Sequence, residues 1–533
     1  MQNLSEFVQA FALRIANEPQ TGSQVPRVFY VGGTVRDRVR GIEAYDVDVE
    51  VYGVAATRVQ ELLEEIAGES VDAFGVAFGV YKISCADGVV DVALPRSESK
   101  KGKGHKGFSI TGDPHLSFED ALRRRDFTMN AMLADVLTGE IIDPYHGKDD
   151  IVHGLLRVVD ERTFVEDPLR IYRGMQFVAR FDFAVEEKSM KLFCEMAQSP
   201  ELDTLSLERV TEEWRKMLRS EHPEKGLRFL EETGLLARYP ELYVLCTTEQ
   251  DSRWHPEGSV WEHVILSCRT PILSGKPVGV NRHPAHQERW IPGQARNDEG
   301  EFDLVTYRLA LLLHDVGKGV VTKKIGKKIS DEGHADAGIE ITKRFFNRFT
   351  FGDDCEKDVL VCVKFHEVLP ELYRKAHAGD FTEAQSANAL RILWRDVGVD
   401  RVPLFLAVCE ANARGRDLPL DDRPYPVRVW AEELSHRYGL FAAAAEPLLS
   451  GADVQNIALR LACPIPQGKK FGMLLADIEL ARDRGEIVTR NDAIGYLEAL
   501  FVSVIPNVRE GSTPPTVISR IHKGDPSWRR DDT

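Results

Sequence analysis

The chain has 533 residues and a mass of 59.9 kDa, with 43% hydrophobic residues and a formal net charge of −16 at pH 7. This length predicts several domains rather than a single core. The acidity excludes a general electrostatic attraction to nucleic acid, so any such contact must use local basic patches. The 8 cysteines include no C-x-x-C pair, which indicates reduced thiols and argues against disulfide frameworks and zinc ribbons.

The N-terminal segment carries apolar residues at helical spacing, namely Leu4, Phe7, Val8, Phe11 and Ile15. It lacks the basic start and the long apolar core of a signal peptide, so we predict an amphipathic helix. No stretch of the chain approaches the length of an apolar membrane span. We therefore expect a soluble, cytoplasmic protein without a membrane partner.

Residues 31–48 read VGGTVRDRVRGIEAYDVD and hold the strongest functional signal in the chain. Gly32 and Gly33 would let a backbone turn approach a triphosphate closely, and the start of the following helix offers unpaired N–H groups. Asp46 and Asp48 lie two apart on an expected strand, so their carboxylates point to the same face. Such carboxylates repel each other unless a divalent cation lies between them, and Mg²⁺ bound together with substrate phosphates suits them. The glycine pair alone would be read as an ordinary turn, and the aspartate pair alone as two solvated side chains. The two together, in this order, favour a functional site.

This segment resembles the signature of the nucleotidyltransferase superfamily, in particular the branch of class II tRNA nucleotidyltransferases and bacterial poly(A) polymerases. The resemblance continues through further motifs over roughly the first 225 residues. It implies an α+β fold, with a small β-sheet head of the nucleotidyltransferase type, an all-α neck and a helical body that resembles HD domains. It also implies that Asp46 and Asp48 are catalytic and hold two Mg²⁺ ions. The nucleotide-binding residues of this first motif would be Gly32, Gly33, Arg36 and Asp37.

The patterning predicts four parts. We expect the catalytic head at residues 1–153, the helical neck at 154–225, the HD-like body at 226–505 and a disordered tail at 506–533. Within the body, an insert at about 271–302 is rich in Pro, Gly, Arg and Asn and shows little periodicity. Its RWIPGQARNDE part resembles peptides encoded by mobile palindromic repeats, which survive where the backbone is exposed.

After the D-x-D strand, residues 56–66 predict a helix, and residues 76–86 and 88–95 predict strands. Asp91 on the second of these strands would supply a third carboxylate to the metal site, or it is an ordinary polar position. Residues 96–107, RSESKKGKGHKG, are too charged and flexible to pack. They resemble a flexible loop that helps to reset the family's enzymes between nucleotides; a solvated surface loop is the alternative. The candidates for RNA contact in this loop are Lys100, Lys101, Lys103 and Lys106.

Residues 123–131, RRRDFTMNA, resemble the family's motif for ribose selection. An Arg–Asp pair can hold the ribose 2′-hydroxyl, which is both a donor and an acceptor. The apolar positions after the charged residues predict a helix that anchors them, and a salt bridge at a helix start is the structural alternative. Residues 141–151 predict the turn that closes the sheet. The residues expected to bind nucleotide here are Arg124, Arg125, Asp126 and Asn130.

Residues 164–181, FVEDPLRIYRGMQFVARF, predict a helix with Asp167, Arg170 and Arg173 on one face. They resemble the family's EDxxR motif, in which an Asp and an Arg read the Watson–Crick edge of the incoming base. A carboxylate accepts from the exocyclic amine of C or A and arginine donates to the ring, which disfavours G and U. An intrahelical salt bridge is the alternative. We interpret the charges of the next helix, at 205–218, as structural.

The second half contains His263, then His314 and Asp315 in LLLHDVGK, and further histidines at 334 and 366. This arrangement resembles HD metal-dependent phosphohydrolases, and it predicts a second divalent metal at His263, His314 and Asp315. Asn412 stands where the family has a ligand Asp, which should lower the metal affinity, and Glu410 faces elsewhere on its helix. A helical body that holds tRNA with degenerate ligands is the alternative.

These patterns predict a template-independent nucleotidyltransferase that adds C and A (CCA) to tRNA 3′ ends, with tRNA, CTP and ATP as its partners and pyrophosphate as its product. A poly(A) polymerase, or an enzyme that adds only CC or only A, is the alternative because the catalytic motifs overlap. An HD phosphohydrolase with a degenerate head is a further alternative. A non-catalytic RNA-binding protein is disfavoured, because unneeded paired carboxylates would repel a phosphate backbone. The sequence leaves the oligomeric state open.

Overall fold

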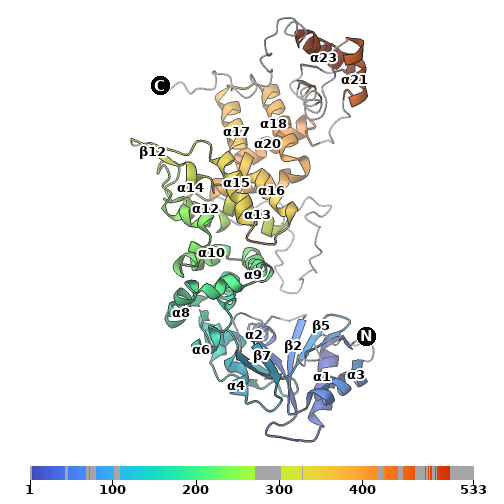
Figure 1. Cartoon of the computed structure of the whole chain (residues 1–533), viewed down its shortest axis with the longest axis vertical. Helices are drawn as coiled ribbons and strands as arrows, with labels where there is room; N and C mark the ends of the chain where they lie inside the picture. Colours follow the sequence, from blue (N-terminus) through green and yellow to red (C-terminus); the bar gives the residue numbers. More distant parts are fainter. Residues whose placement is uncertain are drawn as a thin grey trace. The chain divides into compact units, whose positions relative to one another are not determined.

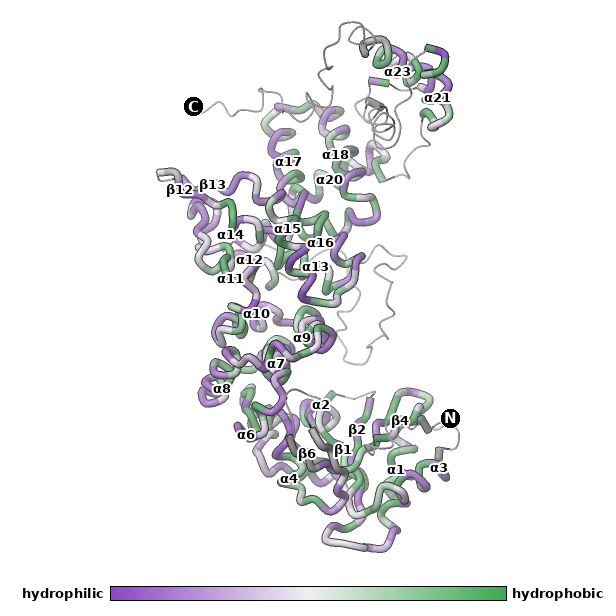
Figure 2. Tube along the Cα trace, in the orientation of Figure 1, coloured by the Kyte–Doolittle hydropathy of each residue, from purple (hydrophilic) through white to green (hydrophobic). Residues whose placement is uncertain are grey.

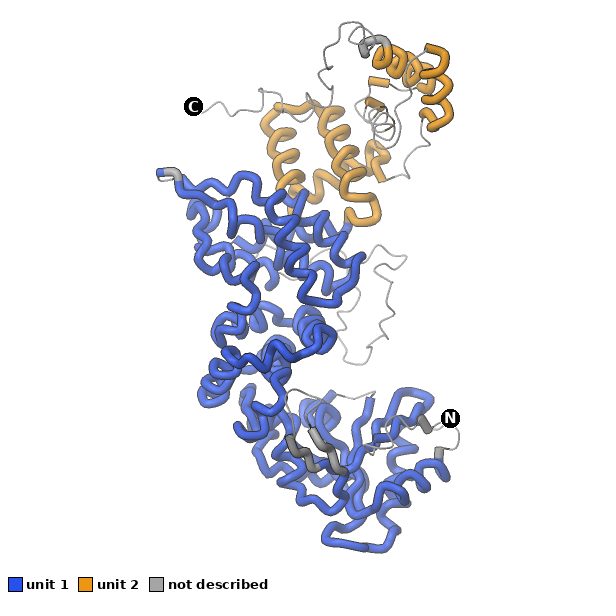
Figure 3. The backbone as a smooth tube through the Cα atoms, viewed as in Figure 1, with its two compact units in different colours: residues 1–366, 403–423 blue, residues 367–402, 424–533 orange. Residues whose placement is uncertain are grey.

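The structure is a computed structural model of the chain. The backbone forms two compact units, residues 1–366 with 403–423 and residues 367–402 with 424–533 (Figure 3). The predicted insert lies almost wholly, and the predicted tail entirely, outside the described residues, and the boundaries of the four predicted parts stay a prediction. The structure describes residues 3–42, 46–67, 71–72, 80–100, 108–269, 302–326, 328–416, 424–441 and 448–461, and discontinuous stretches between 475 and 504.

The head is built on a seven-stranded mixed sheet in the order β3-β4-β5-β2-β1-β8-β9 (Figure 1). Strands β2 and β5 run parallel, whereas the other described pairs of this sheet are antiparallel. The α+β fold class predicted from the sequence is therefore confirmed for the head. The strands are β1 (Arg27–Val31), β2 (Asp46–Tyr52), β3 (Val71–Asp72), β4 (Val80–Ser84), β5 (Val89–Ala93), β8 (Leu133–Asp135) and β9 (Ile141–Ile142).

Side-chain alternation along β2 decides which face of the sheet carries the acidic residues. Val47, Val49 and Val51 are buried in a core shared with helices α1 (Leu4–Ala16) and α3 (Ala56–Ala67). Successive strand residues point to opposite faces, so Asp46 and Asp48 are exposed on the other face. The apolar stripe of α1 is buried in the same core, which confirms the predicted amphipathic helix, and both colours alternate along α1 and α3 in Figure 2.

Three local predictions for the head need correction. Residues 96–100 of the predicted flexible loop form strand β6 (Arg96–Lys100), paired with β7 (Phe108–Gly112), while residues 101–107 and the Lys100 side chain lie outside the description. The RRRD motif follows helix α4 (Phe118–Arg123) and leads into a single 3₁₀ turn at Thr128–Asn130 rather than a long helix. Residues 147–153 of the predicted closing turn form helix α5 (Gly147–His153), which is capped by Asp143.

The neck is helical apart from one short parallel strand pair, β10 (Leu155–Leu156) with β11 (Ala184–Val185). Its central helix α7 (Arg170–Phe181) packs against α9 (Leu207–Arg219) and α10 (Pro223–Glu232). The helix predicted for 164–181 is interrupted, because a proline at 168 disfavours helical backbone at the preceding residue. Asp167 therefore lies before α7 and not on its face, and its carboxylate accepts from the N–H of Leu169 at 3.1 Å. The remaining neck helices are α6 (Glu161–Phe164) and α8 (Glu187–Ala197).

The body within the first unit surrounds helix α13, whose ten residues are all buried. A helix that is apolar on every side belongs in the middle of a helical domain. No described helix is long and apolar enough to cross a membrane. The body elements are α11 (Pro240–Tyr243), α12 (Val260–Arg269), α13 (Leu304–Leu313), α14 (Lys318–Val321), α15 (His334–Phe346), α16 (Asp353–Phe365), α19 (Val402–Arg414) and the hairpin β12 (Lys323–Ile325)–β13 (Lys328–Ser330).

The second unit is helical throughout its described part. Helices α17, α18 and α20 contact one another, and α21 and α23 form a separate pair with its own apolar core. Their bounds are α17 (Val368–Ala378), α18 (Glu383–Val397), α20 (Pro426–Arg437), α21 (Gly451–Arg460) and α23 (Arg490–Val504).

Candidate active site

Three carboxylates lie side by side on the exposed face of the sheet. Asp46 and Asp48 share a face of β2, and Asp91 is the direct partner of Asp48 across the parallel pair β2–β5. Lys82 Nζ lies 3.4 Å from Asp91 Oδ1. Partial desolvation by the surrounding protein raises the pKa of the Asp48 carboxyl, and the charges of Asp91 and Asp46 raise it further. A divalent cation would relieve this repulsion, so the residues present fit such an ion.

A glycine turn lies beside these carboxylates. Gly32 has φ +58° and ψ −125°, a conformation that other residues rarely adopt. A Cβ atom at Gly32 would also lie 2.9 Å from a terminal nitrogen of Arg125. Arg125 in turn donates to Glu50 Oε1 at 2.6 Å, on the same face of β2 as the aspartates. The turn is therefore packed tightly against a guanidinium that faces the acidic strand.

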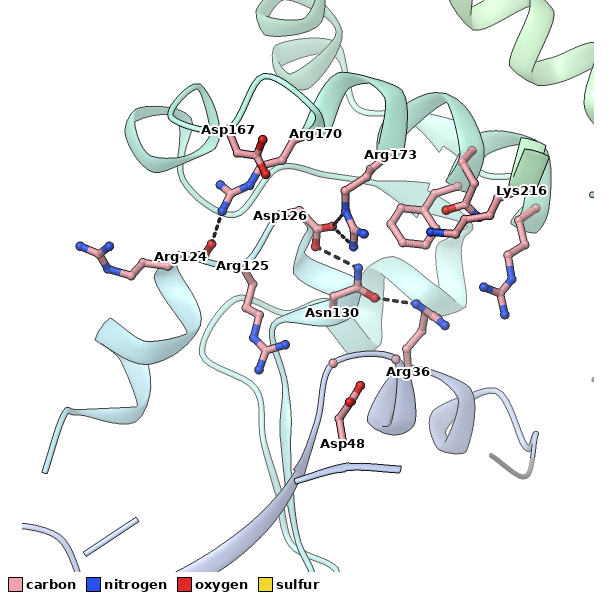
Figure 4. Close-up of a pocket in the computed structure, with 15 residues that line it drawn as sticks. Arg36, Asp48, Arg124, Arg125, Asp126, Asn130, Asp167, Arg170, Arg173 and Lys216 are labelled. Carbon is pink, nitrogen blue, oxygen red and sulfur yellow. Dashed lines mark hydrogen bonds and ion pairs between the residues drawn. The ribbon is translucent and has the colours of Figure 1, made fainter. Parts of the chain in front are cut away.

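A cavity of about 390 Å³ joins the glycine turn to helix α7 (Figure 4). Its volume falls within the range of small-molecule sites. In Figure 4, Asp48 lies at one end of the cavity and Asp167 and Arg170 at the other. Of the predicted site residues, Asp46 and Asp37 do not line it. The lining consists of Gly32, Gly33, Arg36, Asp48, Arg124, Arg125, Asp126, Asn130, Asp167, Arg170, Arg173, Gln176, Phe177, Arg180 and Lys216.

A chain of hydrogen bonds crosses the middle of the cavity. Asp126 Oδ2 accepts from Arg173 Nε at 2.6 Å, and its Oδ1 accepts from the Asn130 amide at 2.9 Å. Asn130 Oδ1 accepts from Arg36 at 2.8 Å, and Arg36 donates two hydrogen bonds to Asp37. Burial alone would raise the pKa of Asp126, but Arg173 and Asn130 lower it to about 2. Asp126 is therefore an ionised acceptor at neutral pH.

Asp167 and Arg170 both line the cavity, and Asp167 precedes the helix that begins at Arg170, so the two do not share a helix face. Asp167 Oδ2 accepts from Arg209 at 3.2 Å. Arg170 donates to the backbone carbonyls of Thr163 at 2.8 Å and Arg124 at 2.6 Å. Asp167 and Arg170 are thus held at one end of the cavity by different partners.

A second group of titratable residues is buried in the body around Asp315, which is 2% exposed. Its Oδ2 lies 3.4 Å from Nε2 of His314 and 4.0 Å from Nε2 of His263. Its Oδ1 lies 3.3 Å from Nε2 of His334 and 3.4 Å from Nε2 of His366. These residues come from α12, the end of α13, the start of α15 and the end of α16. Elements far apart in sequence therefore direct four imidazole nitrogens at one carboxylate.

The Nδ1 atom of each histidine in this group lies within hydrogen-bonding distance of another group. Nδ1 of His263 lies 2.8 Å from Glu257 Oε1, and Nδ1 atoms of the other three lie within 3.0 Å of backbone carbonyls. This arrangement leaves Nε2 for a metal, as is usual for ligating histidines. Nε2 of His263 lies 2.9 Å from Asn412 Oδ1, whereas Glu410 pairs with Arg414. Asn412 thus lies beside His263 at the edge of this group, and the predictions that it takes a ligand's place and that Glu410 faces elsewhere stay predictions.

Three family models match successive parts of the chain. Residues 28–157 match the poly(A) polymerase head domain, residues 182–245 the probable RNA- and SrmB-binding site of polymerase A, and residues 290–392 the HD domain. The multifunctional CCA protein of Pseudomonas fluorescens is 32% identical over 75% of this chain and 87% of its own length. The chain belongs to the multifunctional CCA protein family.

Further relatives of this family and solved structures support the same fold. The multifunctional CCA protein of Vibrio parahaemolyticus is 31% identical over 81% of this chain and 93% of its own. The Bacillus stearothermophilus CCA-adding enzyme, solved with CTP, is 21% identical with a TM-score of 0.58 and covers 95% of this chain and 100% of its own. The Thermotoga maritima CCA-adding enzyme, solved with tRNA, is 18% identical with a TM-score of 0.53 and covers 93% of this chain and 95% of its own.

Reasoning from the sequence missed four residues that line the cavity of this CCA-family head. Gln176, Phe177 and Arg180 continue the spacing of three and four from Arg173 along α7, and this periodicity could have revealed them. Lys216 lies on α9, whose charges were interpreted as structural, and it pairs with Glu213 at 2.9 Å. Lys216 nevertheless lines the cavity, and Arg209 on the same helix holds Asp167, so the structural charges of α9 bear on the site.

Proposed function

We propose that the chain adds the CCA sequence to tRNA 3′ ends from CTP and ATP, without a template and with release of pyrophosphate. The observation that supports this most directly is the convergence on one cavity of Asp48, the Asp126–Arg173 pair and Asp167 with Arg170. These groups match the three requirements of nucleotide transfer, namely metal, ribose and base. The family relationship supports the same reaction, and we place the protein in the cytoplasm.

Asp46 and Asp48, with Asp91 beside them, would hold two Mg²⁺ ions. When bound, these ions lower the pKa of the RNA 3′-hydroxyl and neutralise the triphosphate as pyrophosphate leaves. Gly32 and Gly33 bring backbone close to the triphosphate, since a side chain at Gly32 is excluded by Arg125. The attacking oxygen belongs to the RNA, and the leaving pyrophosphate belongs to the nucleotide. The reaction therefore requires no covalent bond to the protein.

The incoming nucleoside would be oriented by the groups deeper in the cavity. Asp126, held ionised by Arg173, accepts a hydrogen bond from the ribose 2′-hydroxyl. Asp167 accepts from the exocyclic amine of C or A, while Arg170 donates to the neighbouring ring nitrogen. G and U present a carbonyl where C and A present the amine, so they would face Asp167 with an unpaired acceptor.

The direct test uses purified protein, Mg²⁺ and tRNA lacking its 3′ CCA, with CTP alone, ATP alone, or both. Addition of two nucleotides with CTP and of three with both nucleotides, followed by a stop, is the expected result. Unlimited A tails would identify a poly(A) polymerase, and addition of CC or A alone a specialised enzyme. No extension under any condition would contradict the transferase assignment.

A second activity is supported by the body. We infer that the group around Asp315 holds a divalent metal and hydrolyses phosphate esters, because four histidines already present Nε2 to it. Asn412 is only a neutral ligand, but His334 and His366 provide donors that the predicted three-residue set did not include. Metal analysis of the purified protein and hydrolysis of bis(p-nitrophenyl) phosphate, each compared with Asp315→Asn, test this inference. If the purified protein contains no metal and does not hydrolyse the ester after addition of Mn²⁺, Ni²⁺ or Co²⁺, the inference is wrong. The body would then be a domain that holds tRNA.

A further inference from the structure

Three arginines surround one phenylalanine at the junction of α7 and helix α2 (Gly33–Val39). The guanidinium carbons of Arg36, Arg40 and Arg180 lie 4.8, 4.4 and 5.0 Å from the ring centroid of Phe181. Each distance is within the reach of a cation–π contact. Phe181 is buried, and it serves as an apolar support that collects three positive charges in one place. We call this group the Phe181 arginine cluster.

The charges of this cluster are not balanced within the described part of the chain. Arg36 donates three hydrogen bonds, two to the oxygens of Asp37 and one to Asn130. Asp37 is the carboxylate whose charge acts on Arg40 and Arg180, and each of its oxygens already accepts a hydrogen bond from Arg36. Among the described residues, the side chains of Arg40 and Arg180 form neither a salt bridge nor a hydrogen bond. Three guanidinium groups therefore face a single carboxylate.

This arrangement is unfavourable in the free protein. Desolvation lowers the pKa of Arg40 and of Arg180, and the charge of Arg36 lowers both further. Both side chains are nevertheless solvent-accessible, so an anion from solution can reach them. An anion bound at these guanidinium groups would reduce the repulsion and satisfy donors that have no partner among the described residues. An accessible group of like charges of this kind attracts anions.

The position of the cluster indicates which anion it binds. Arg36 and Arg180 line the nucleotide cavity, whereas Arg40 lies outside it, so the cluster extends from the cavity to the surface. In the proposed function, the glycine turn and the acidic strand already bind the triphosphate of the nucleotide. Phe181 directly precedes residues 182–245, which match the RNA-binding family model. The outward arginines therefore lie where an RNA strand would approach the nucleotide.

We propose that Arg40 and Arg180, supported by Phe181, bind a phosphodiester of the RNA strand whose 3′ end is being extended. This proposal rests on the proposed function, because it assigns the strand that the transferase extends. Binding here would hold the last nucleotides of the RNA beside the cavity and so present the 3′-hydroxyl to the incoming nucleotide. Each guanidinium offers phosphate oxygens a planar fork of N–H donors, which suits this role.

The test compares Arg40→Gln with Arg38→Gln in the full-length protein. Both variants remove one charge at the C-terminal end of α2, but the Arg38 guanidinium lies 3.7 Å from the ring of Tyr30 and outside the cluster. With CTP saturating, we expect Arg40→Gln to raise KM for tRNA about fivefold and to lower the salt dependence of tRNA binding by about one ion. Its KM for CTP and its kcat should stay unchanged. Arg38→Gln should behave like the wild type, and Arg40→Lys should recover most of the affinity.

A second arm identifies the phosphate. A neutral methylphosphonate replaces, in turn, each of the last several phosphodiester linkages of the RNA substrate. Substitution at one of these linkages should weaken binding to the wild type. At that position Arg40→Gln should lose no further affinity. An increase in KM for CTP instead of tRNA would mean that the cluster binds the triphosphate and would overturn the proposal. An equal loss of tRNA affinity in Arg40→Gln and Arg38→Gln, or no loss in either, would also overturn the proposal. Failure of the wild type and of all variants to extend RNA would instead contradict the proposed function itself.

The stability of the variant gives an independent reading. Because Arg40 adds to a repulsive cluster in the free protein, Arg40→Gln should melt at or above the wild-type temperature. Weaker tRNA binding together with lower stability would indicate a structural role for Arg40 and would contradict the proposal.

Discussion

The head and the body each gather carboxylates or histidines for a metal, but they do so in opposite ways. In the head, Asp46 and Asp48 are exposed on a strand, and the charge of Arg125 opposes the rise in the pKa of Asp48 without cancelling it. In the body, Asp315 is 2% exposed and is surrounded by four imidazoles and by Lys318 at 2.7 Å. The head is thus incomplete without its substrate, whereas the body is assembled in advance.

This difference follows from the chemistry of the two ligand sets. Oxygen ligands suit Mg²⁺, which keeps waters and substrate phosphates in its shell, so an open strand face is adequate. Imidazole ligands suit transition metals, which prefer a fixed number of donors in a fixed geometry. The arginines that line the cavity of the head suit the binding and release of nucleotide phosphates. The histidines of the body suit the retention of a transition metal.

The largest expected effect is the loss of transfer in the head. Asp48→Asn removes a metal ligand but keeps the shape of the side chain, and we expect pyrophosphate release with CTP and tRNA to fall at least about a thousandfold. The metal content of the body should not change. Glu140→Gln, which alters an exposed carboxylate of the head far from the cavity lining, is the control and should retain activity.

The corresponding change in the body is Asp315→Asn. It removes the carboxylate that all four histidines share, so we expect the resident metal to be lost while nucleotide addition stays within about twofold of the wild type. Elemental analysis after gel filtration measures the metal, and the same sample is assayed for CTP incorporation. Loss of both properties, with circular dichroism showing a folded protein, would contradict the independence of the two centres.

Base selection should depend on Asp167 and less on the residue that positions it. Asp167→Asn replaces an acceptor by a group that can also donate, so we expect kcat/KM for CTP and ATP to fall about 10- to 100-fold and UTP to be incorporated relatively better. Arg209→Gln should cause a smaller loss of the same kind, because it removes only the 3.2 Å contact to Asp167. Glu166→Gln, one residue away and outside the cavity lining, is the matched control.

Asn412 allows a gain-of-function test of the body. Asn412→Asp would place a charged ligand beside His263, whose Nε2 now lies 2.9 Å from the amide oxygen. We expect the affinity for Mn²⁺ or Ni²⁺ to rise about tenfold, measured by competition with a coloured chelator. Unchanged affinity would indicate that Asn412 lies outside the coordination shell, and that His334 and His366 complete it.

The smallest effect concerns stability. The pKa of Asp126 is lowered to about 2 in the folded protein, so the Asp126–Arg173 pair stabilises the fold fully above the unfolded pKa near 4 and loses this contribution as the pH falls toward 2. Arg173→Gln should therefore reduce the free energy of unfolding at pH 7 by on the order of 2 kcal/mol. In urea titrations at pH 3 the difference between the variant and the wild type should be smaller. A difference that is the same at both pH values would show that the ion pair is not its cause.

The sequence predicted the head better than the details that complete it. Period-two spacing was enough to place Asp46 and Asp48 on one face, because alternation is local. Asp91 was a candidate for the same site, but its position directly opposite Asp48 depends on the parallel register of two strands about forty residues apart, which no local pattern gives. The proline at 168 could have warned that Asp167 precedes its helix. The lysines of the loop at 101–107 stay a prediction, because they lie outside the described residues.

The body shows the same limit. The HD pair and His263 were predicted from local patterns and a resemblance, but the convergence of His334 and His366 on Asp315 is a tertiary contact between helix ends. Single histidines on flanking helices carry no spacing signal that would place them in one site. Their buried Nε2 atoms become meaningful only once α13, α15 and α16 are packed together.

One measurement tests the central claim that the head alone performs transfer while the body is a separate metal centre. It is the length of the product formed from tRNA lacking CCA with CTP, ATP and Mg²⁺, resolved to one nucleotide, for the wild type, Asp48→Asn and Asp315→Asn. The account predicts three added nucleotides and a stop for the wild type and Asp315→Asn, and none for Asp48→Asn. Full extension by Asp48→Asn, or a product that is lost or changed in length in a folded Asp315→Asn, would contradict it.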